Sequence, residues 1–518
     1  MDHRRREGYA AAAATALLAG LLLMWTVVTP AYRASDEPMH VSTAVRLAES
    51  GRYPEAGRAL MDPAVLASYR WVNYFGASGR APALERSPGL AQPPSMSQLE
   101  APDVPRPRTA IDQMTQHPPG YYLVLAGAIR LLSLDGSSPT GLVLALRLVS
   151  VLMFLPIPFL CLLVARQVGL SPRVAAAAAF LPAAWTQFVH SAASVSNGAL
   201  LALSTSVAIA LVVPVARGDV RVRRALGVGA AVSVGLFSKG FALALLPVVV
   251  FAYLLGARRG GAGRALLGLV VAGVATLPGL WWWVLNVVRY GALQPQAGPS
   301  TPQAAALPPV SQWAEIFGLT FMRTLWIALG WAENRPPQWL YVGLTVCFAL
   351  LLLVGSWALR RRVGVLLLLH LCWLGPLAIV VLGSFWEFER SGQTRAAQGR
   401  YVQTAIVAFA VLAAAALFRL HRVIVAVPPV VLAVGLGGIA FGLYHFWVPA
   451  TGYDRALGRV VAMSDWWPGG GATWLVVGAG LAVIGGLAGV VTMRAIPQRP
   501  APARDQAARS GEPVRVAS

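Results

Sequence analysis

The chain has 518 residues, of which 57% are hydrophobic and only 12% are charged, and its formal net charge is +21. Soluble domains carry about 25% charged residues, so this low fraction, together with several long apolar runs, excludes a soluble enzyme. All three cysteines, Cys161, Cys347 and Cys372, fall within apolar runs, which excludes a disulfide framework. The composition therefore predicts an all-α integral membrane protein.

Apolar segments long enough to cross a bilayer recur along the chain. We expect about twelve transmembrane helices, at residues 9–29, 141–165, 174–190, 198–216, 225–238, 240–257, 265–285, 338–359, 363–384, 401–418, 423–444 and 472–493. The first segment resembles a secretory signal, but its apolar stretch is longer than a signal core and Trp25 lies near its outer boundary. We therefore expect it to be retained as a span.

The positive charge gathers in alternate connections between these spans. On the side of the N-terminus, five connections contain 14 arginines and a single acid, Asp219. These arginines are Arg166, Arg173, Arg217, Arg221, Arg223, Arg224, Arg258, Arg259, Arg264, Arg360, Arg361, Arg362, Arg419 and Arg422. An arginine excess marks cytoplasmic loops, so both termini are expected in the cytoplasm of a bacterial plasma membrane, and the charge requires no nucleic-acid partner.

The largest non-spanning region, residues 30–140, lies on the outer side in this topology and holds ten of the 21 acids. Its first part, DEPMHVSTAVRLAESG, has apolar residues at helical spacing, Pro38 in the first turn and Gly51 after the end, which predicts an amphipathic interfacial helix. Residues 81–108 contain seven prolines and predict an irregular strap over the outer face. The apolar segment after HPPGYY is too short to span and predicts a re-entrant or juxtamembrane helix.

A second outer loop, residues 286–337, contains the apolar segment SQWAEIFGLTFMRTLWIALGW. Glu315 and Arg323 interrupt this segment, so we expect an interfacial helix rather than a span. Residues 494–518 are predicted to form a disordered cytoplasmic tail.

None of the 21 acids falls inside a predicted span. A coupled transporter usually places ionisable groups near the middle of the membrane, so this distribution disfavours that class. Two adjacent acids, Asp36 and Glu37, instead follow the first span directly, at the outer membrane surface. Such carboxylates can supply a general base, and the alternative is a helix N-cap. His40 lies one helical turn beyond Glu37 on the same face.

Two basic residues stand out by their positions. Lys239, in FSKGFA at the predicted outer junction of two spans, is the only lysine beside 41 arginines, and the alternative to a functional role is a snorkelling side chain at a helix end. Arg147 lies inside the second span, where an isolated guanidinium is costly, so we expect an anionic partner from the protein or from a lipid headgroup.

The segment QTRAAQGRYVQTAI leads from outside into the tenth span and places Arg395 and Arg400 near the interface. Guanidinium groups at headgroup depth suit phosphate oxygens. The alternative is a structural loop in which these arginines pair with Glu387 and Glu389.

Five motifs taken in order carry a family resemblance: DE after the first span, HPPGYYL, an arginine in LALRLVS, SKG between two spans, and QGRY before a late span. This order resembles the bacterial membrane glycosyltransferases of the GT-C architecture that use polyprenyl-phosphate sugars, such as arabinose and mannose transferases. The DEPMH form is most similar to a DEPxH branch of that superfamily. The resemblance covers residues 1 to about 420.

The resemblance implies that an acid of the first outer loop, Asp36 or Glu37, acts as the catalytic base. It also implies that the HPP segment, Lys239 and Arg400 surround the lipid phosphate and the sugar. With the charge pattern, the expected substrate-binding residues are His40, His117, Pro118, Pro119, Tyr121, Tyr122, Arg147, Asn197, Lys239, Arg395, Gln398, Arg400 and Tyr401.

The sequence departs from the family where the outer loop after the third span often contributes an acid, because it reads HSAASVSNG here. Ser196 and Asn197 stand in that loop. The ligands of any divalent cation would therefore be Asp36, Glu37 and neutral groups, and no cofactor is identified.

The sequence as a whole predicts a glycosyltransferase that moves a sugar from a polyprenyl-phosphate donor to a glycan, lipid or protein acceptor of the cell envelope. The active site is expected on the outer face, and the transfer is expected to invert the anomeric carbon. The alternatives are a flippase or transporter of lipid-linked sugars, and a non-catalytic scaffold on the same fold.

Overall fold

The structure is a computed structural model of the chain and describes residues 3–74, 93–107, 110–295, 307–334, 336–420, 423–450 and 452–497. Within these ranges it is helical, and the one extended pairing is an isolated antiparallel bridge between Leu60 and Ile111. Residues 81–92 and 108 of the predicted strap, Arg422, and residues 498–518 of the predicted tail lie outside the described residues. The predicted all-α class is confirmed.

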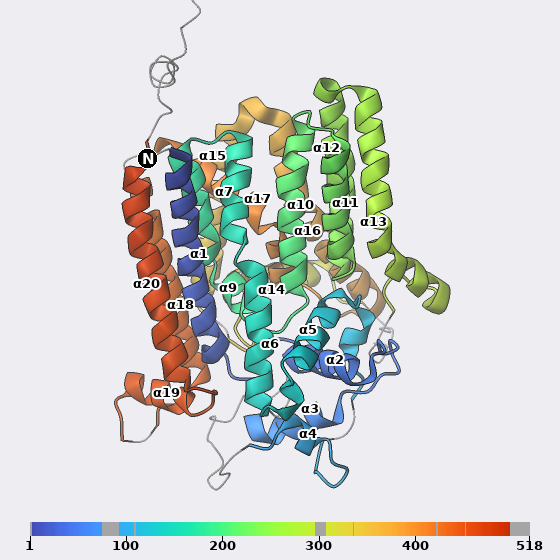
Figure 1. The fold of residues 1–518 in the computed structure, drawn as a ribbon, viewed down its shortest axis with the longest axis vertical. Helices are drawn as coiled ribbons and strands as arrows, with labels where there is room; N and C mark the ends of the chain where they lie inside the picture. Colours follow the sequence, from blue (N-terminus) through green and yellow to red (C-terminus); the bar gives the residue numbers. More distant parts are fainter. Residues whose placement is uncertain are drawn as a thin grey trace, which may run out of the picture.

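In the described residues, each predicted span coincides with one helix or with a pair of consecutive helices, and most of those labelled in Figure 1 run lengthwise through the molecule. The helices of the predicted spans are α1 (His3–Val28), α6 (Pro139–Phe154) with α7 (Ile157–Val168), α8 (Pro172–Phe180) with α9 (Thr186–Ala192), α10 (Gly198–Ala216), α11 (Val222–Leu236), α12 (Leu245–Gly260), α13 (Ala262–Tyr290), α15 (Gln338–Leu359), α16 (Val363–Ser391), α17 (Ile406–Ala416), α18 (Val427–Phe446) and α20 (Gly471–Ala495).

Nine described stretches are long and apolar enough to cross a membrane by length and composition. One of them, Gln338–Ser391, contains both α15 and α16, which join at η6 (Arg360–Arg362). The predicted spans 141–165 and 174–190 are each interrupted at a proline. Proline lacks a backbone N–H and cannot continue the hydrogen-bond ladder of a helix. Pro156 separates α6 from α7, and Pro182 lies in η4 (Leu181–Ala184) between α8 and α9.

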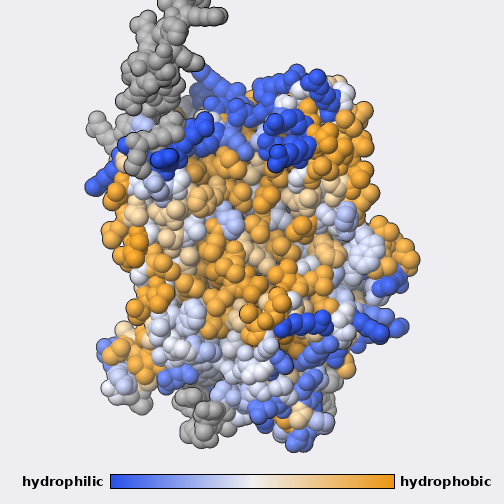
Figure 2. Space-filling view, in the orientation of Figure 1, coloured by the Kyte–Doolittle hydropathy of each residue, from blue (hydrophilic) through white to orange (hydrophobic). Residues whose placement is uncertain are grey.

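The start of α1 and the end of α20 lie together at one end of the molecule. Arg6 donates a hydrogen bond to the carbonyl of Ala495, and Arg173 donates to the carbonyl of Ile496. We call this the arginine end, because the connections after α7, α10, α12 and α15 bring their arginines to it. The opposite end, the loop end, holds the outer-loop helices. Figure 2 shows an apolar belt between these two polar ends, as expected of a membrane protein.

The loop end contains the helices that lie outside the predicted spans. They are α2 (Glu37–Ser50), α3 (Pro63–Ser68), α4 (Met96–Leu99), α5 (Gly120–Leu131), α14 (Val310–Trp326) and α19 (Arg455–Ser464). The short 3-10 helices besides η4 and η6 are η1 (Tyr69–Val72), η2 (Gln113–Gln116), η3 (Leu134–Gly136), η5 (Gly240–Ala244), η7 (Gly399–Ala405), η8 (Leu417–Arg419) and η9 (Ile424–Ala426).

The helix expected after the first span is present as α2, with Pro38 in its first turn. Gly51 ends it at φ 65° and its N–H donates to the carbonyl of Leu47. A left-handed residue in this position is favourable for glycine. The segment after HPPGYY forms α5, which packs against α2 at the loop end. Both predicted helices are thus confirmed.

Glycines let the last helix approach the first. A Cβ at Gly20 would lie 2.4 Å from the backbone nitrogen of Ala482 on α20, and a Cβ at Gly485 would lie 2.4 Å from the backbone nitrogen of Leu17 on α1. Small residues at such contacts allow membrane helices to pack closely. The last span therefore supports α1, which leads directly into the candidate site.

Candidate active site

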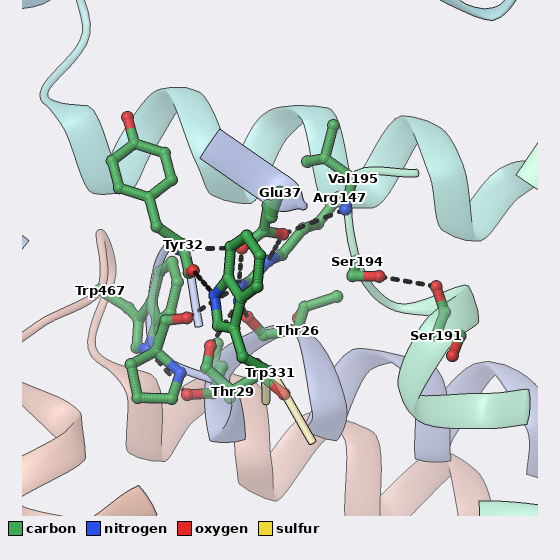
Figure 3. A network of polar contacts seen from close by, with 12 residues as sticks. Thr26, Thr29, Tyr32, Glu37, Arg147, Ser191, Ser194, Val195, Trp331 and Trp467 are labelled. Carbon is green, nitrogen blue, oxygen red and sulfur yellow. Dashed lines mark hydrogen bonds and ion pairs between the residues drawn. The ribbon is translucent and has the colours of Figure 1, made fainter. Parts of the chain in front are cut away.

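A fully buried ion pair between Arg147 and Glu37 lies beneath the candidate site (Figure 3). Arg147, on α6, donates from Nε to Glu37 Oε1 over 2.8 Å and from NH2 to Glu37 Oε2 over 2.6 Å. Both side chains are 0% exposed. The Glu37 carboxylate also accepts hydrogen bonds from the backbone N–H groups of Tyr32, over 2.9 Å, and Val195, over 3.0 Å.

The remaining N–H donors of Arg147 bind backbone carbonyls at the C-terminal end of α1. NH1 donates to the carbonyls of Thr26 and Thr29, over 2.6 and 2.5 Å, and NH2 donates to that of Pro30 over 3.0 Å. The last carbonyls of a helix have no partner within the helix, so the guanidinium satisfies them. Since all five N–H groups of an arginine are used in this way, Arg147 is committed to the protein. The anionic partner expected for it is Glu37.

Asp36, next to Glu37, faces a different way. It has φ 64°, and its side chain forms no N-cap bond to α2. A non-glycine residue in the left-handed region is strained, and such strain is typical of functional positions. Its carboxylate is 33% exposed and accepts a hydrogen bond from NH2 of Arg400 over 3.2 Å. The turn at Asp36 thus separates a cavity-facing carboxylate from a buried one.

Asp36 and Arg400 line a narrow cavity of about 80 Å³ at the loop end. Its polar lining includes Ser35, Asp36, His40, His190, Ser191, Ser194, Ser196, Lys239, Arg400, Tyr401, Gln403 and Thr404. Its apolar lining includes Phe154, Phe188, Leu201 and Phe241. A pocket with a few charged groups converging on an apolar wall is typical of a ligand site.

Two cations of the cavity lie against one aromatic ring. Lys239 Nζ lies 5.0 Å from the ring centre of Tyr401, and Cζ of Arg400 lies 5.5 Å from it. Tyr401 in turn stacks on Phe241, with ring centres 4.8 Å apart. Burial, and then the charge of Arg400, lowers the pKa of Lys239 to about 8. A bound anion would reverse this effect, so the pair is suited to a phosphate.

The HPPGYY motif contacts the turn that carries Lys239. The N–H of Gly120 donates to the carbonyl of Phe237 over 2.8 Å, which joins α5 to the turn that carries Lys239. A Cβ at Gly120 would lie 2.5 Å from that carbonyl oxygen, so only glycine fits. The neighbouring tyrosine, Tyr121, accepts from the N–H of Ser196 over 2.9 Å and is paired with Ser150 over 2.7 Å.

We expect Gly120→Ala to displace the lysine turn and to weaken binding of a prenyl phosphate about tenfold, because small misplacements of a binding group are costly. Titration of the purified protein with farnesyl phosphate measures this. Gly127→Ala, on the same helix with nothing within 4 Å of its Cβ, is the matched control and should bind as the wild type does. Equal affinities for all three proteins would remove this contact from the site.

The expected histidines are bonded to buried tyrosines, and His40 also lines the cavity. Nδ1 of His40 is 2.9 Å from the hydroxyl of Tyr122, and the two rings stack. The carbonyl of His117 accepts from the hydroxyl of Tyr53 over 2.8 Å. Burial lowers the pKa of both histidines, to about 3 for His117. Pro118 and Pro119 are buried beside them and lead into α5.

The structure does not bring every expected residue to the cavity. Arg395 is exposed, and its Nε donates to the side chain of Gln393 over 2.8 Å. Gln398 and Asn197 do not line the cavity. Asn197 is fully buried, and its carbonyl accepts from Ser238 over 2.8 Å beside the lysine turn. Arg400 pairs with Asp36 over 3.2 Å, and Glu387 pairs with Arg390 over 2.9 Å.

The sequence reasoning missed His190, which lines the cavity and is 3% exposed. Within the described residues, neither ring nitrogen has a hydrogen-bond partner. Because buried polar atoms are rarely left without a partner, these nitrogens are available to a ligand. Ser194 follows the end of helix α9, which carries His190, and its hydroxyl donates to the carbonyl of Ser191 over 2.7 Å. The signal was the polar run HSAAS, which begins in the last turn of an apolar helical segment.

The described residues contain no cluster of three or more His, Cys, Asp and Glu side chains that could hold a metal ion. The suggested cation ligands were Asp36 and Glu37, and the oxygens of Glu37 already accept four hydrogen bonds from Arg147 and two backbone N–H groups. The geometry therefore gives a cation at this position no support.

A family model described as "Predicted membrane protein (DUF2142)" matches residues 18–412. The chain belongs to this family. Helices α18 and α20 lie beyond the matched residues, whereas the whole cavity and the buried ion pair lie within them. A comparison with curated protein sequences finds no significant match for this DUF2142 protein.

Among solved structures, the chain is similar to ArnT from Cupriavidus metallidurans in the apo state, at 18% identity with a TM-score of 0.47, covering 91% of this chain and 74% of that one. The same protein bound to undecaprenyl phosphate gives 16% identity and a TM-score of 0.45, covering 92% and 76%. The apo oligosaccharyltransferase of Archaeoglobus fulgidus gives 13% identity and a TM-score of 0.41, covering 92% and 56%.

Proposed function

We propose that this protein is a membrane glycosyltransferase that transfers a sugar from a polyprenyl-phosphate donor to a hydroxyl of a cell-envelope acceptor. One observation carries the proposal: the cavity-facing carboxylate of Asp36 stands beside two cations, Arg400 and Lys239, that flank a single ring. A base next to a phosphate-binding pair is the arrangement that displacement of a phosphate by a hydroxyl requires.

The reaction has a simple balance. Asp36 accepts the proton of the acceptor hydroxyl, and the acceptor oxygen forms a bond to the anomeric carbon of the sugar. The bond between that carbon and the phosphate oxygen breaks, and the lipid phosphate leaves with the electron pair. One such displacement inverts the anomeric carbon. Lys239 and Arg400 stabilise the charge that develops on the leaving phosphate.

The other cavity residues have supporting roles in this proposal. His190 and Ser194 offer hydrogen-bonding atoms to the sugar, and Phe154 and Phe241 offer an apolar surface to the prenyl chain. Arg147 does not touch the substrate. It holds Glu37, and through the backbone at Tyr32 it positions the turn that presents Asp36.

The arginine distribution supports a bacterial plasma-membrane protein with cytoplasmic termini. The described connections at the arginine end carry twelve arginines and one acid, Asp219, while the cavity lies at the loop end. We propose accordingly that the active site faces the outer side. The acceptor, whether glycan, lipid or protein, would then approach from the cell envelope.

Native mass spectrometry of the detergent-purified protein tests the phosphate site. A polyprenyl phosphate or its glycosylated form should co-purify with the wild type and be lost from Arg400→Ala. Arg395→Ala, an exposed arginine five residues away, should retain it and serves as the matched control. Absence of lipid from all three intact proteins would contradict the proposal.

Release of free lipid phosphate then separates an enzyme from a flippase. Proteoliposomes loaded with polyprenyl-phosphate sugars from a membrane lipid extract should produce free polyprenyl phosphate when acceptor is added. A transporter moves the donor intact and releases none. Movement without release would overturn the proposal in favour of transport.

Phosphate binding should depend on pH through Lys239. The proton leaves this ammonium group as the pH rises through about 8, so affinity for farnesyl phosphate should be constant at lower pH and fall about tenfold or more above it. Lys239→Arg should remove the fall, because a guanidinium stays protonated. Titrations between about pH 7 and pH 10 check this, since a phosphomonoester is already doubly charged there. An unchanged profile in the arginine variant would assign the fall to another group.

A further inference from the structure

Two neighbouring cavities at the arginine end form a second, separate site. One has a volume of about 390 Å³ and lies between the ends of α7, α10 and α12 and the start of α16. The other, of about 490 Å³, lies between the turn after α7, the join of α15 and α16, and the residues that follow α17. Gly169, Arg361 and Arg362 line both cavities, so the two adjoin.

The lining is strongly cationic. The arginines are Arg173, Arg217, Arg258, Arg259, Arg361 and Arg362, and no acid among the described residues lines either cavity. The two described acids at this end are engaged elsewhere. Glu7 pairs with Arg166 over 3.3 Å, and Asp219 pairs with Arg221 and Arg224 over 2.7 and 2.8 Å. In the described part of the chain, none of the six lining arginines forms an ion pair with a carboxylate.

One of these cations is held in position by the fold. Arg362 NH1 donates to the carbonyl of Val168, and its guanidinium lies against Gly169. Gly169 has φ 86°, and a Cβ there would collide with the guanidinium of Arg362. The turn after α7 therefore leaves space for this charge, as expected of a built binding site rather than of a loose surface side chain.

Apolar residues at the rim indicate which anion fits. Val363 and Phe418 line the cavities and are 58% and 39% exposed. Leu254, one turn from the cavity residue Arg258, is 62% exposed. Guanidinium groups at headgroup depth beside exposed aliphatic side chains suit a phosphodiester with acyl chains, whereas a free phosphate needs no such rim.

We propose that the two cavities bind the headgroup of an anionic phospholipid from the leaflet at the arginine end. This site is independent of the proposed transfer reaction, because no residue is shared between it and the Asp36 cavity. Its occupant would fix the turn after α7 to the join of α15 and α16.

Titration of the delipidated protein with short-chain phosphatidylglycerol, followed by native mass spectrometry, tests the proposal. We expect saturable binding in the wild type and a loss of affinity of about tenfold or more in Arg361→Gln/Arg362→Gln. Arg223→Gln/Arg264→Gln removes the same charge from exposed positions outside the cavities and should change the affinity less than about twofold. Short-chain phosphatidylcholine should not compete.

Several results would overturn the proposal. Equal losses in the two double variants would assign the binding to general surface charge, and non-saturable binding would show that no site exists. Inorganic phosphate that competes as well as the lipid would identify a free-anion site instead. If the double variant does not fold, Arg361→Gln alone gives the same test, because Arg361 lines both cavities and forms no ion pair in the described residues.

Discussion

Asp36→Asn should lower sugar transfer by about 10²–10⁴-fold, because it removes the group proposed to accept the proton of the acceptor hydroxyl. The amide keeps the size of the side chain but cannot act as a base. Binding of polyprenyl phosphate should persist, since Arg400 and Lys239 are unchanged and Arg400 loses its competing carboxylate. Transfer assays and native mass spectrometry on the same preparation separate these two effects.

Two further variants make the result specific. Asp103→Asn, an exposed acid of the same outer loop, should keep full activity. Asp36→Gly suits the local φ of 64° better than aspartate does, so it should fold as the wild type does and still be inactive. Full transfer by folded Asp36→Asn would exclude this carboxylate from the chemistry.

The fold was largely predictable because apolar length and arginine asymmetry are strong local signals in membrane proteins. The prediction 198–216 coincides with α10, and 338–359 coincides with α15. The breaks at Pro156 and Pro182 were not predicted. Prolines occur within membrane helices, as Pro278 does in α13, so a proline alone does not show whether a helix is interrupted.

The individual residues of the candidate site were largely predictable from the sequence, but the contacts between them were not. The motifs around Asp36, Lys239 and Arg400 were recognised separately, and the structure brings all three to one cavity. The partner of Arg147 could not be named, because Glu37 is 110 residues away in the chain and a lipid phosphate would satisfy the same charge. His190 was missed because a single histidine in the last turn of an apolar helix is ordinarily a packing residue.

Sequence alone also treated Asp36 and Glu37 as equivalent. Adjacent residues share the same chain position and the same apolar surroundings, and only the left-handed turn at Asp36 sends their side chains in different directions. Glu37 then becomes the buried partner of a buried arginine, while Asp36 reaches the cavity. Of the two acids, Asp36 is therefore the one that we propose as the base.

This distinction predicts a different outcome for Glu37→Gln, which should destabilise the protein by about 3–5 kcal/mol because Arg147 keeps a buried charge without its counter-charge. Arg147→Met should also be strongly destabilising, since it leaves the Glu37 carboxylate and the carbonyls at the end of α1 without their donor. Unfolding of the purified proteins, followed by tryptophan fluorescence, measures both effects.

The double variant Glu37→Gln/Arg147→Met tests the pair itself. It should cost less than the sum of the two single changes, because each single change counts the lost ion pair once. Glu49→Gln, an exposed acid on the same helix α2, should change the stability by less than about 0.5 kcal/mol and is the matched control. If Glu37→Gln instead left the stability unchanged and abolished transfer, Glu37 would act in the reaction, and the positioning role of the buried pair would be refuted.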